Sequence, residues 1–311
     1  MKKDIVHLLA CPFCKGELTL QVDQYDSNEV KEGSLLCECG KRYPIKRYIP
    51  RFVDTDNYVE SFSFEWDIFR KVQLDSINRT TESEETFKEK TGFDLSSAKG
   101  KLFLDAGCGA GRFMEVVVKY GGIVVGVDLS FAVDSAFDNI GLKEGVHIIQ
   151  ADIFNLPFRE GAFDFIYSIG VLHHTPDTRS AFLRLPRFLK SGGEIAIYVY
   201  DYYKLRFLII SQIWRRITTK LPKRLLYLMS YAAVPLYYIW KIPFIGLPMQ
   251  IIFPINMHKS WRWRVLDTFD WYSPKYQHKH TYYEVYRWFK EGGLSNIEIL
   301  KFPVSVKGMK L

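Results

Sequence analysis

Short apolar runs alternate with amphipathic stretches through the middle of the chain. Five runs rich in branched apolar residues predict buried strands, at 101–105, 123–128, 146–150, 163–168 and 194–200. The stretches between them have the spacing of helices, at 112–120, 131–140 and 177–189. Strands that alternate with helices are typical of a parallel sheet covered by helices on both faces. We therefore expect an α/β fold with a doubly wound, mostly parallel sheet.

This alternation stops at Asp201 and is replaced by an apolar, aromatic and basic stretch over 202–266. Two charge-free runs in it, 225–240 and 242–258, are shorter than the roughly 20 residues of a spanning helix, and proline interrupts both. A transmembrane hairpin is therefore the less favoured interpretation. After this stretch, Tyr282–Lys290 predicts one more helix and 297–306 predicts the closing strands.

The pattern divides the chain into four parts. Residues 1–56 are expected to form a zinc ribbon, and 57–100 a helical linker that packs on the core. The core itself would consist of 101–201 and 267–311, interrupted by a helical insertion at 202–266 that serves as a lid or a membrane-surface element.

Composition adds a charge asymmetry to this picture. Of the 311 residues, 48% are apolar and 25% charged, which excludes wholesale disorder. The net charge is +7, yet residues 202–266 contain eleven Lys or Arg and no Asp or Glu, so the rest of the chain is mildly acidic. One strongly basic segment on an acidic body predicts an anionic partner.

Four of the five cysteines form two close pairs, which predicts a metal site in a reducing compartment. Cys11 and Cys14 lie on one turn and Cys37 and Cys39 on another, so four thiolates can hold a tetrahedral, structural Zn²⁺. The N-terminus lacks the apolar region and cleavage site of a signal peptide, and we expect a cytoplasmic protein.

Candidate ligand-binding groups follow each predicted strand of the core. Gly107, Gly109 and Gly111 come after the first strand, where alternate glycines allow a sharp turn and close approach of a ligand. Asp105 precedes them, and a carboxylate there suits a cationic amino acid moiety better than a pyrophosphate. Asp128 ends the second strand, where an acidic residue can bind both hydroxyls of a ribose.

The later strands add further groups to the same site. Asp152 and Ile153 follow the third strand and can bind an adenine amino group and cover its ring, and Ser168 ends the fourth strand. Because carboxyl ends of parallel strands share one edge of the sheet, these groups converge on one crevice.

Residues 102–200 resemble a class I S-adenosylmethionine-dependent methyltransferase of the ubiquinone/menaquinone biosynthesis type (methyltransferase type 11). The motifs that match are LDAGCGAGR, VGVDLS, QADIFNLPF and FDFIYSIGVLHHTPD, in the family's order. By this resemblance, the sheet is seven-stranded and Rossmann-like, and S-adenosylmethionine is the cofactor. Its methionine portion would lie beside Asp105 and the glycines, its ribose beside Asp128 and Leu129, and its sulfonium beside Ser168.

The N-terminal segment separately resembles the small zinc-binding domain that precedes some methyltransferase domains. CPFCKGEL and YPIKRYIPRF are the matching pieces. The second cysteine pair departs from that pattern, because one residue instead of two separates Cys37 from Cys39.

Two histidines after the fourth strand are candidate catalytic bases. His173 or His174 could remove a proton from a hydroxyl acceptor, while the alternative is a histidine that caps the next helix or lines the pocket. Cys108 is interpreted as a small residue that fits the loop, not as a nucleophile.

The acceptor is expected to be a small, hydrophobic or lipid-linked molecule, methylated by in-line transfer. The long charge-free runs of the insertion favour an anionic membrane surface, on the inner face of the membrane, over nucleic acid. An RNA methyltransferase acting on guanine of ribosomal RNA is the alternative, because a zinc domain before a class I core also resembles those enzymes. A third interpretation is a zinc-ribbon binding module on an inactive methyltransferase fold.

Overall fold

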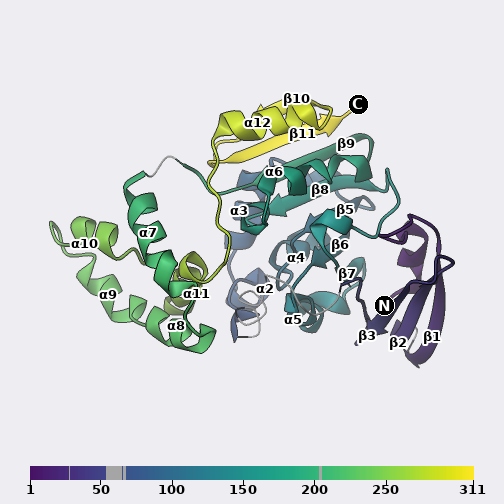
Figure 1. The fold of residues 1–311 in the computed structure, drawn as a ribbon, viewed down its shortest axis with the longest axis horizontal. Coiled ribbons are helices and arrows are strands. Elements are labelled where there is room, and N and C mark those ends of the chain that lie inside the picture. The colour runs from purple at the N-terminus through teal and green to yellow at the C-terminus, as the bar shows by residue number, and fades with distance from the viewer. Residues whose placement is uncertain (28, 54–64, 66–67, 203–204) are drawn as a thin grey trace.

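The computed structural model describes residues 1–27, 29–53, 65, 68–202 and 205–311 (Figure 1). Most of 57–67, the first part of the expected helical linker, lies outside the described residues. Two sheets organise the rest, with four strands in order β1-β2-β3-β4 and seven in order β10-β11-β9-β8-β5-β6-β7. The seven-stranded sheet with flanking helices confirms the predicted fold class.

The small sheet forms the N-terminal end of the molecule, and all its neighbouring strands pair antiparallel. Its strands are β1 (Leu18–Asp26), β2 (Glu29–Cys37), β3 (Arg42–Lys46) and β4 (Ile49–Pro50). The strands bury one face: Val30, Leu35 and Ile45 are almost fully buried. A 3₁₀ helix, Lys3–Leu8, precedes the first cysteine pair.

The large sheet pairs its strands in parallel except at β11, which runs antiparallel to both neighbours. The strands are β5 (Leu102–Ala106), β6 (Ile123–Asp128), β7 (Val146–Gln150), β8 (Phe163–Ile169), β9 (Leu189–Tyr198), β10 (Leu294–Ile299) and β11 (Ser305–Lys310). The central strands consist mainly of buried apolar residues, as expected for strands covered on both faces.

The helices that cover this sheet agree with the apolar spacing in most places. They are α2 (Asp75–Asn78), α3 (Glu82–Thr91), α4 (Arg112–Lys119), α5 (Ala132–Ala136), α6 (Thr178–Leu183) and α12 (Tyr282–Glu291). The helix expected at 177–189 was predicted too long: α6 ends at Leu183, a 3₁₀ turn starts at Pro186, and β9 already begins at Leu189. Proline cannot continue an α-helix because its ring blocks the preceding turn.

Over its described residues, the insertion folds into five helices on one side of the large sheet (Figure 1). They are α7 (Leu205–Thr218), α8 (Lys223–Ser230), α9 (Ala233–Ile239), α10 (Gly246–Ile252) and α11 (Trp261–Tyr272). The boundary expected at residue 266 falls inside α11. Among the described residues, none of the helices combines the length and apolarity needed to cross a bilayer.

The ribbon and the large sheet share one hydrophobic core. Leu9 forms a bridge to Phe158, and the amide of Phe52 donates a 2.8 Å hydrogen bond to the carbonyl of Gln150 at the end of β7. Ile5, Leu9 and Leu35 belong to the same buried cluster as residues of β5, β6 and β8. The ribbon therefore packs against the large sheet beside its edge strand β7 and is not a separate module on a flexible tether.

This shared core predicts that ribbon and sheet unfold together. Phe158 is 1% exposed and packs edge-on against Phe163, with ring centroids 5.0 Å apart. Phe158→Ala should lower the free energy of unfolding by about 3–5 kcal/mol, because it leaves a cavity at the junction. Leu142→Ala, at a side chain 74% exposed, should change it by no more than about 0.5 kcal/mol. Denaturant unfolding followed by circular dichroism should show one transition; separate loss of the ribbon would contradict the shared core.

Candidate active site

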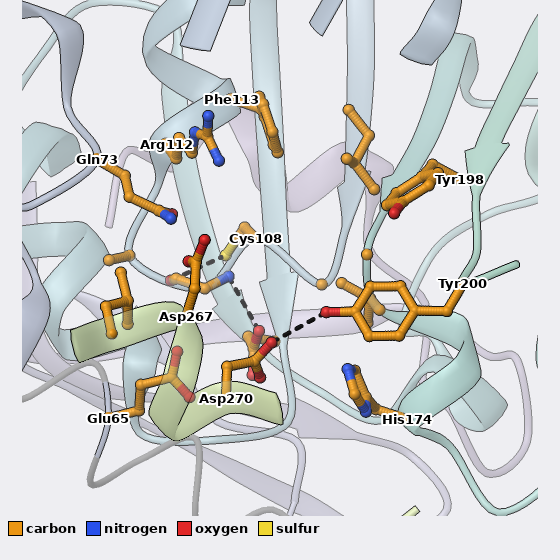
Figure 2. Close-up of a pocket in the computed structure, with 18 of the residues that line it drawn as sticks. Glu65, Gln73, Cys108, Arg112, Phe113, His174, Tyr198, Tyr200, Asp267 and Asp270 are labelled. Carbon is orange, nitrogen blue, oxygen red and sulfur yellow. Dashed lines mark hydrogen bonds between the residues drawn. The ribbon is translucent and has the colours of Figure 1, made fainter. Parts of the chain in front are cut away.

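A cavity of about 480 Å³ opens where the order of the large sheet reverses. Its lining comes from the loops after β5, β6, β7 and β8, from the end of β9 and from α11 of the insertion (Figure 2). Crevices at such a switch point are the usual ligand sites of open α/β sheets. The cavity joins groups that lie up to 237 residues apart in the sequence (302 − 65), from Glu65 to Phe302.

The glycine loop after β5 forms one wall and is tied to β6. The amides of Gly107 and Cys108 both donate to the carbonyl of Val127, at 2.8 and 3.0 Å. Gly107 has a φ of +98°, and a Cβ there would lie 2.3 Å from Cγ1 of Val171. Only glycine therefore allows this turn, which brings the backbone of Gly107 and Gly109 to the cavity surface.

Asp128 is held in a fixed orientation at the end of β6. Its Oδ2 accepts a 3.0 Å hydrogen bond from the amide of Gly109, and its Oδ1 accepts from the amide and hydroxyl of Ser130 at 2.9 and 2.7 Å. Burial raises the pKa of this carboxyl, and these hydrogen bonds oppose the rise. Asp128 and Leu129 line the cavity, as the ribose assignment requires.

Asp152 and Ile153 line the same cavity beyond β7. The Oδ1 atom of Asp152 accepts a 2.9 Å hydrogen bond from the amide of Phe154 and so begins a short 3₁₀ turn. This bond fixes the carboxylate, and Ile153 adds an apolar surface beside it. The pair fits the edge and face of an adenine ring.

Three of the residues expected at the cofactor lie behind the loop instead of on the cavity surface. Ser168 is fully buried and donates a 2.6 Å hydrogen bond to the carbonyl of Ala106, which supports the end of β5. Gly111 starts α4, and a Cβ there would lie 2.7 Å from Cδ1 of Ile140. Asp105 is 2% exposed, its Oδ2 has no hydrogen-bond partner among the described residues, and burial raises its pKa.

Carboxyl groups from the insertion gather at the opposite end of the cavity (Figure 2). Asp267 and Asp270 project from α11, and Glu65 lies beside them. Burial, followed by the charge of Asp270, raises the pKa of Asp267 to about 7, while Nδ2 of Asn256 donates to its Oδ2 at 2.7 Å. Burial and the two aspartates raise the pKa of Glu65. The hydroxyl of Tyr200 donates a 3.0 Å hydrogen bond to Asp270.

Two cations face these carboxyl groups. Lys90 places its Nζ 3.8 Å from the ring centroid of Tyr198, and burial lowers its pKa to about 7. Arg112 donates from Nε to the hydroxyl of Ser83 at 2.9 Å and covers the ring of Trp263, and burial lowers its pKa to about 10. Arg112 is the last residue of the LDAGCGAGR motif, so the sequence did contain a signal for this cation.

The two candidate histidines, His173 and His174, differ in their access to the cavity. His174 lines the cavity, and its Nδ1 lies 2.8 Å from the carbonyl of Tyr276; since a carbonyl only accepts, Nδ1 carries the proton. His173 is fully buried, does not line the cavity and packs against the ring of Tyr200, with centroids 3.9 Å apart. Burial lowers the pKa of both rings. His173 supports Tyr200 from behind and has no path to an acceptor.

Comparison with known proteins agrees with this geometry. Residues 104–197 match the family model of a methyltransferase domain, and residues 2–47 match that of a Trm112p-like protein. The chain carries a class I S-adenosylmethionine-dependent methyltransferase domain. The glycine backbone, Asp128 and the Asp152–Ile153 pair in this methyltransferase domain fit S-adenosylmethionine, and Arg112 can pair with its carboxylate.

The names of the relatives of this methyltransferase domain refer to different acceptor molecules. Sterol 24-C-methyltransferase ERG6B of Gibberella zeae is 27% identical over 46% of this chain and 38% of its own length. Probable tRNA methyltransferase 9B of Mus musculus is 36% identical over 32% of this chain and 22% of its own. The tRNA (carboxymethyluridine(34)-5-O)-methyltransferase alkbh8 of Xenopus tropicalis is 30% identical over 60% of this chain and 30% of its own length. The chain thus spans less than two fifths of each of these relatives.

A solved structure also aligns with most of the chain. It belongs to the complex between the Haloferax volcanii Trm112 methyltransferase activator and a methyltransferase, and covers 82% of this chain and 99% of its own at a TM-score of 0.49 and 13% identity.

The four cysteines of the ribbon form a cluster that could hold a metal ion, with the expected composition. The Sγ atoms of Cys11, Cys14, Cys37 and Cys39 all lie within 4.8 Å of one another, with 3.3 Å between Cys14 and Cys37. A tetrahedron with metal–sulfur bonds of about 2.3 Å places its sulfurs about 3.8 Å apart, so the four thiols fit Zn²⁺. Four thiolates leave no open position, and the metal would be structural. Although only one residue separates Cys37 from Cys39, the four Sγ atoms still converge on one point.

The ribbon also reaches the cofactor wall through one side chain. Nη1 of Arg51 donates to Oε1 of Gln150 at 2.8 Å, and Nε2 of Gln150 donates to the carbonyl of Leu129 at 3.0 Å. A second nitrogen of Arg51 pairs with Asp134 at 2.9 Å. These contacts connect the ribbon to Leu129, which follows Asp128 in the cofactor wall.

Asp128→Ala should weaken the binding of S-adenosylhomocysteine at least about tenfold, because it removes a buried, oriented carboxylate worth about 1.5–3 kcal/mol in a hydrogen bond. Asp138→Ala removes a half-exposed carboxylate of the neighbouring helical segment and serves as the matched control. Isothermal titration calorimetry measures both. Equal affinities of the two variants would refute the ribose assignment.

Metal removal should destabilise the whole chain, because the ribbon shares its core with the large sheet. Cys14→Ala should lose the bound zinc and lower the melting temperature, whereas Cys108→Ala, outside the cluster, should keep about one zinc per chain. Elemental analysis and differential scanning calorimetry give the two readouts. Full zinc content in Cys14→Ala would contradict the four-thiolate site.

Proposed function

We propose that this chain is an S-adenosylmethionine-dependent methyltransferase whose acceptor is a small, largely apolar molecule with a hydroxyl or amine. The observation that carries the proposal is the single cavity lined by the cofactor loops at one end and by Asp267, Asp270 and Tyr200 at the other. An acceptor seated against α11 would therefore face the cofactor directly.

The chain's own residues would align the acceptor and handle its proton. Bound S-adenosylmethionine supplies a methyl group that is already activated on a sulfonium sulfur. Alignment and exclusion of water then account for most of the rate, and α11 closes the cavity over the cofactor loops. Asp267, with a pKa of about 7, is suited to accept the acceptor's proton near neutral pH. Tyr200, fixed by its bond to Asp270, would orient the acceptor atom.

The acceptor end of the cavity supports a molecule with both apolar and polar groups. Trp263, Leu266, Trp271 and Phe302 line it together with the carboxyls. Relatives named as sterol methyltransferases are in keeping with an apolar acceptor. None of the relatives cited here is named for a lipid-linked acceptor.

An RNA acceptor is the second candidate. It is supported by relatives named as tRNA methyltransferases and by the Trm112p-like segment. The carboxyl of Asp270 at the acceptor end weighs against it, since a carboxylate there would repel a phosphate that approached it.

Transfer of labelled methyl groups distinguishes the two acceptors. The protein would be incubated with methyl-tritiated S-adenosylmethionine and an extract of its host, and the organic, aqueous, RNA and protein fractions counted. The proposal expects label in the small molecules of the organic or aqueous fraction. Label that is released by nuclease would favour RNA, and no label in any fraction would favour the inactive binding module.

The raised pKa of Asp267 predicts the shape of the pH profile. If Asp267 accepts the proton, kcat should fall as the pH drops below about 7, because protonation then removes the base. Asp267→Asn should lower kcat at least about 100-fold and abolish that limb, while the affinity for S-adenosylhomocysteine changes little. Asp23→Asn, at an exposed carboxylate on β1, is the control. An Asp267→Asn variant that retained the wild-type profile would exclude this role.

A further inference from the structure

The outermost part of the insertion presents large apolar side chains to solvent. Residues 238–247 comprise the end of α9, the turn that follows it and the start of α10, at the end of the molecule opposite the ribbon (Figure 1). Phe244 is 96% exposed, Leu247 69% and Tyr238 68%. Ile239, Ile242 and Ile245 are also exposed. We call this segment the apolar tip.

The apolar tip is held in place by packing at its base. Trp240 is 8% exposed, packs with Ala233 and Ile255, and donates from Nε1 to the carbonyl of Phe253 at 3.2 Å. Gly246 lies so close to Trp240 that a Cβ would meet its carbonyl oxygen at 1.8 Å. The base is therefore tightly packed, and the apolar side chains project from it instead of folding back over it.

The segment that contains the apolar tip has formal charges of one sign in its sequence. The tip contains Lys241 and no acidic residue, and 202–266 as a whole contains no Asp or Glu. Two of its arginines are structural: Arg215 and Arg264 are buried and donate to backbone carbonyls. Among the side chains that the structure describes in this segment, six cations are exposed, namely Arg216, Lys220, Arg224, Lys241, Lys259 and Arg262.

We propose that the apolar tip inserts into the interfacial layer of an anionic lipid bilayer. Exposed aromatic and aliphatic side chains next to unopposed Lys and Arg suit the acyl boundary and the negative headgroups at once. An RNA backbone would match the cations but would leave Phe244 and Leu247 in water. Among the described residues no helix could span the bilayer, so the contact would be peripheral. This proposal is independent of the acceptor and of catalytic activity.

Sedimentation with vesicles of phosphatidylglycerol and phosphatidylcholine tests the proposal. Phe244→Ser/Leu247→Ser should reduce vesicle binding at least about tenfold, because the side chains that enter the lipid are lost. Leu142→Ser/Tyr283→Ser removes two apolar side chains of similar exposure, 74% and 68%, from other surfaces and should bind as the wild type does. Unchanged affinity for S-adenosylhomocysteine would show that each variant is folded.

Lys241→Glu provides a second, electrostatic test. It should weaken binding to vesicles that contain phosphatidylglycerol but not to vesicles of phosphatidylcholine alone. The proposal is overturned if the wild-type protein fails to sediment with anionic vesicles, or if the apolar-tip variant binds them as well as the wild type. It is also overturned if the wild type ignores vesicles and forms a dimer that the apolar-tip variant cannot form, since a second copy would then cover the tip.

Discussion

The hydrogen bond from the amide of Gly109 to Asp128 ties the glycine loop to the end of β6, and the cofactor wall depends on this connection. Gly107 and Cys108 reinforce it through the carbonyl of Val127. The bond requires β5 and β6 to be parallel neighbours in register, so that both strands end at the same edge. It also requires glycine at position 107, where Val171 leaves no space for a side chain. The sheet, the turn and the carboxylate thus form one unit.

The insertion supplies what this unit lacks. The loops of the sheet provide groups that fit a nucleoside and an amino acid, but the polar groups at the acceptor end come mainly from Asp267 and Asp270 of α11 and from Tyr200 just beyond β9, with Glu65 beside them. Burial in the shared cavity brings Asp267 to a pKa near 7. The same five-helix unit carries the apolar tip at its far end. One element therefore serves two proposed roles, closure of the cavity and attachment to a surface.

The sequence predicts the local structure well because apolar periodicity and turn residues act over short distances. The strands at 123–128 and 146–150 and the convergence of four cysteines are all found. Asp267 and Asp270 were missed because they belong to no motif, and only the packing of α11 brings them to the loops. The neighbours His173 and His174 are both buried and differ in access to the cavity, which tertiary packing decides and a sequence pattern does not encode. The sequence counts Arg215 and Arg264 among the basic residues of the insertion and so suggests surface charges. In the structure both are buried and donate hydrogen bonds to backbone carbonyl groups inside the insertion.

A crystal structure with S-adenosylhomocysteine would test the central claim most directly, namely that the cofactor loops and α11 face each other across one cavity. The account predicts the ribose hydroxyls at Asp128, the adenine at Asp152 and Ile153, and the sulfur directed towards Asp267 and Tyr200. A ligand bound elsewhere, or with its sulfur directed away from α11, would contradict it.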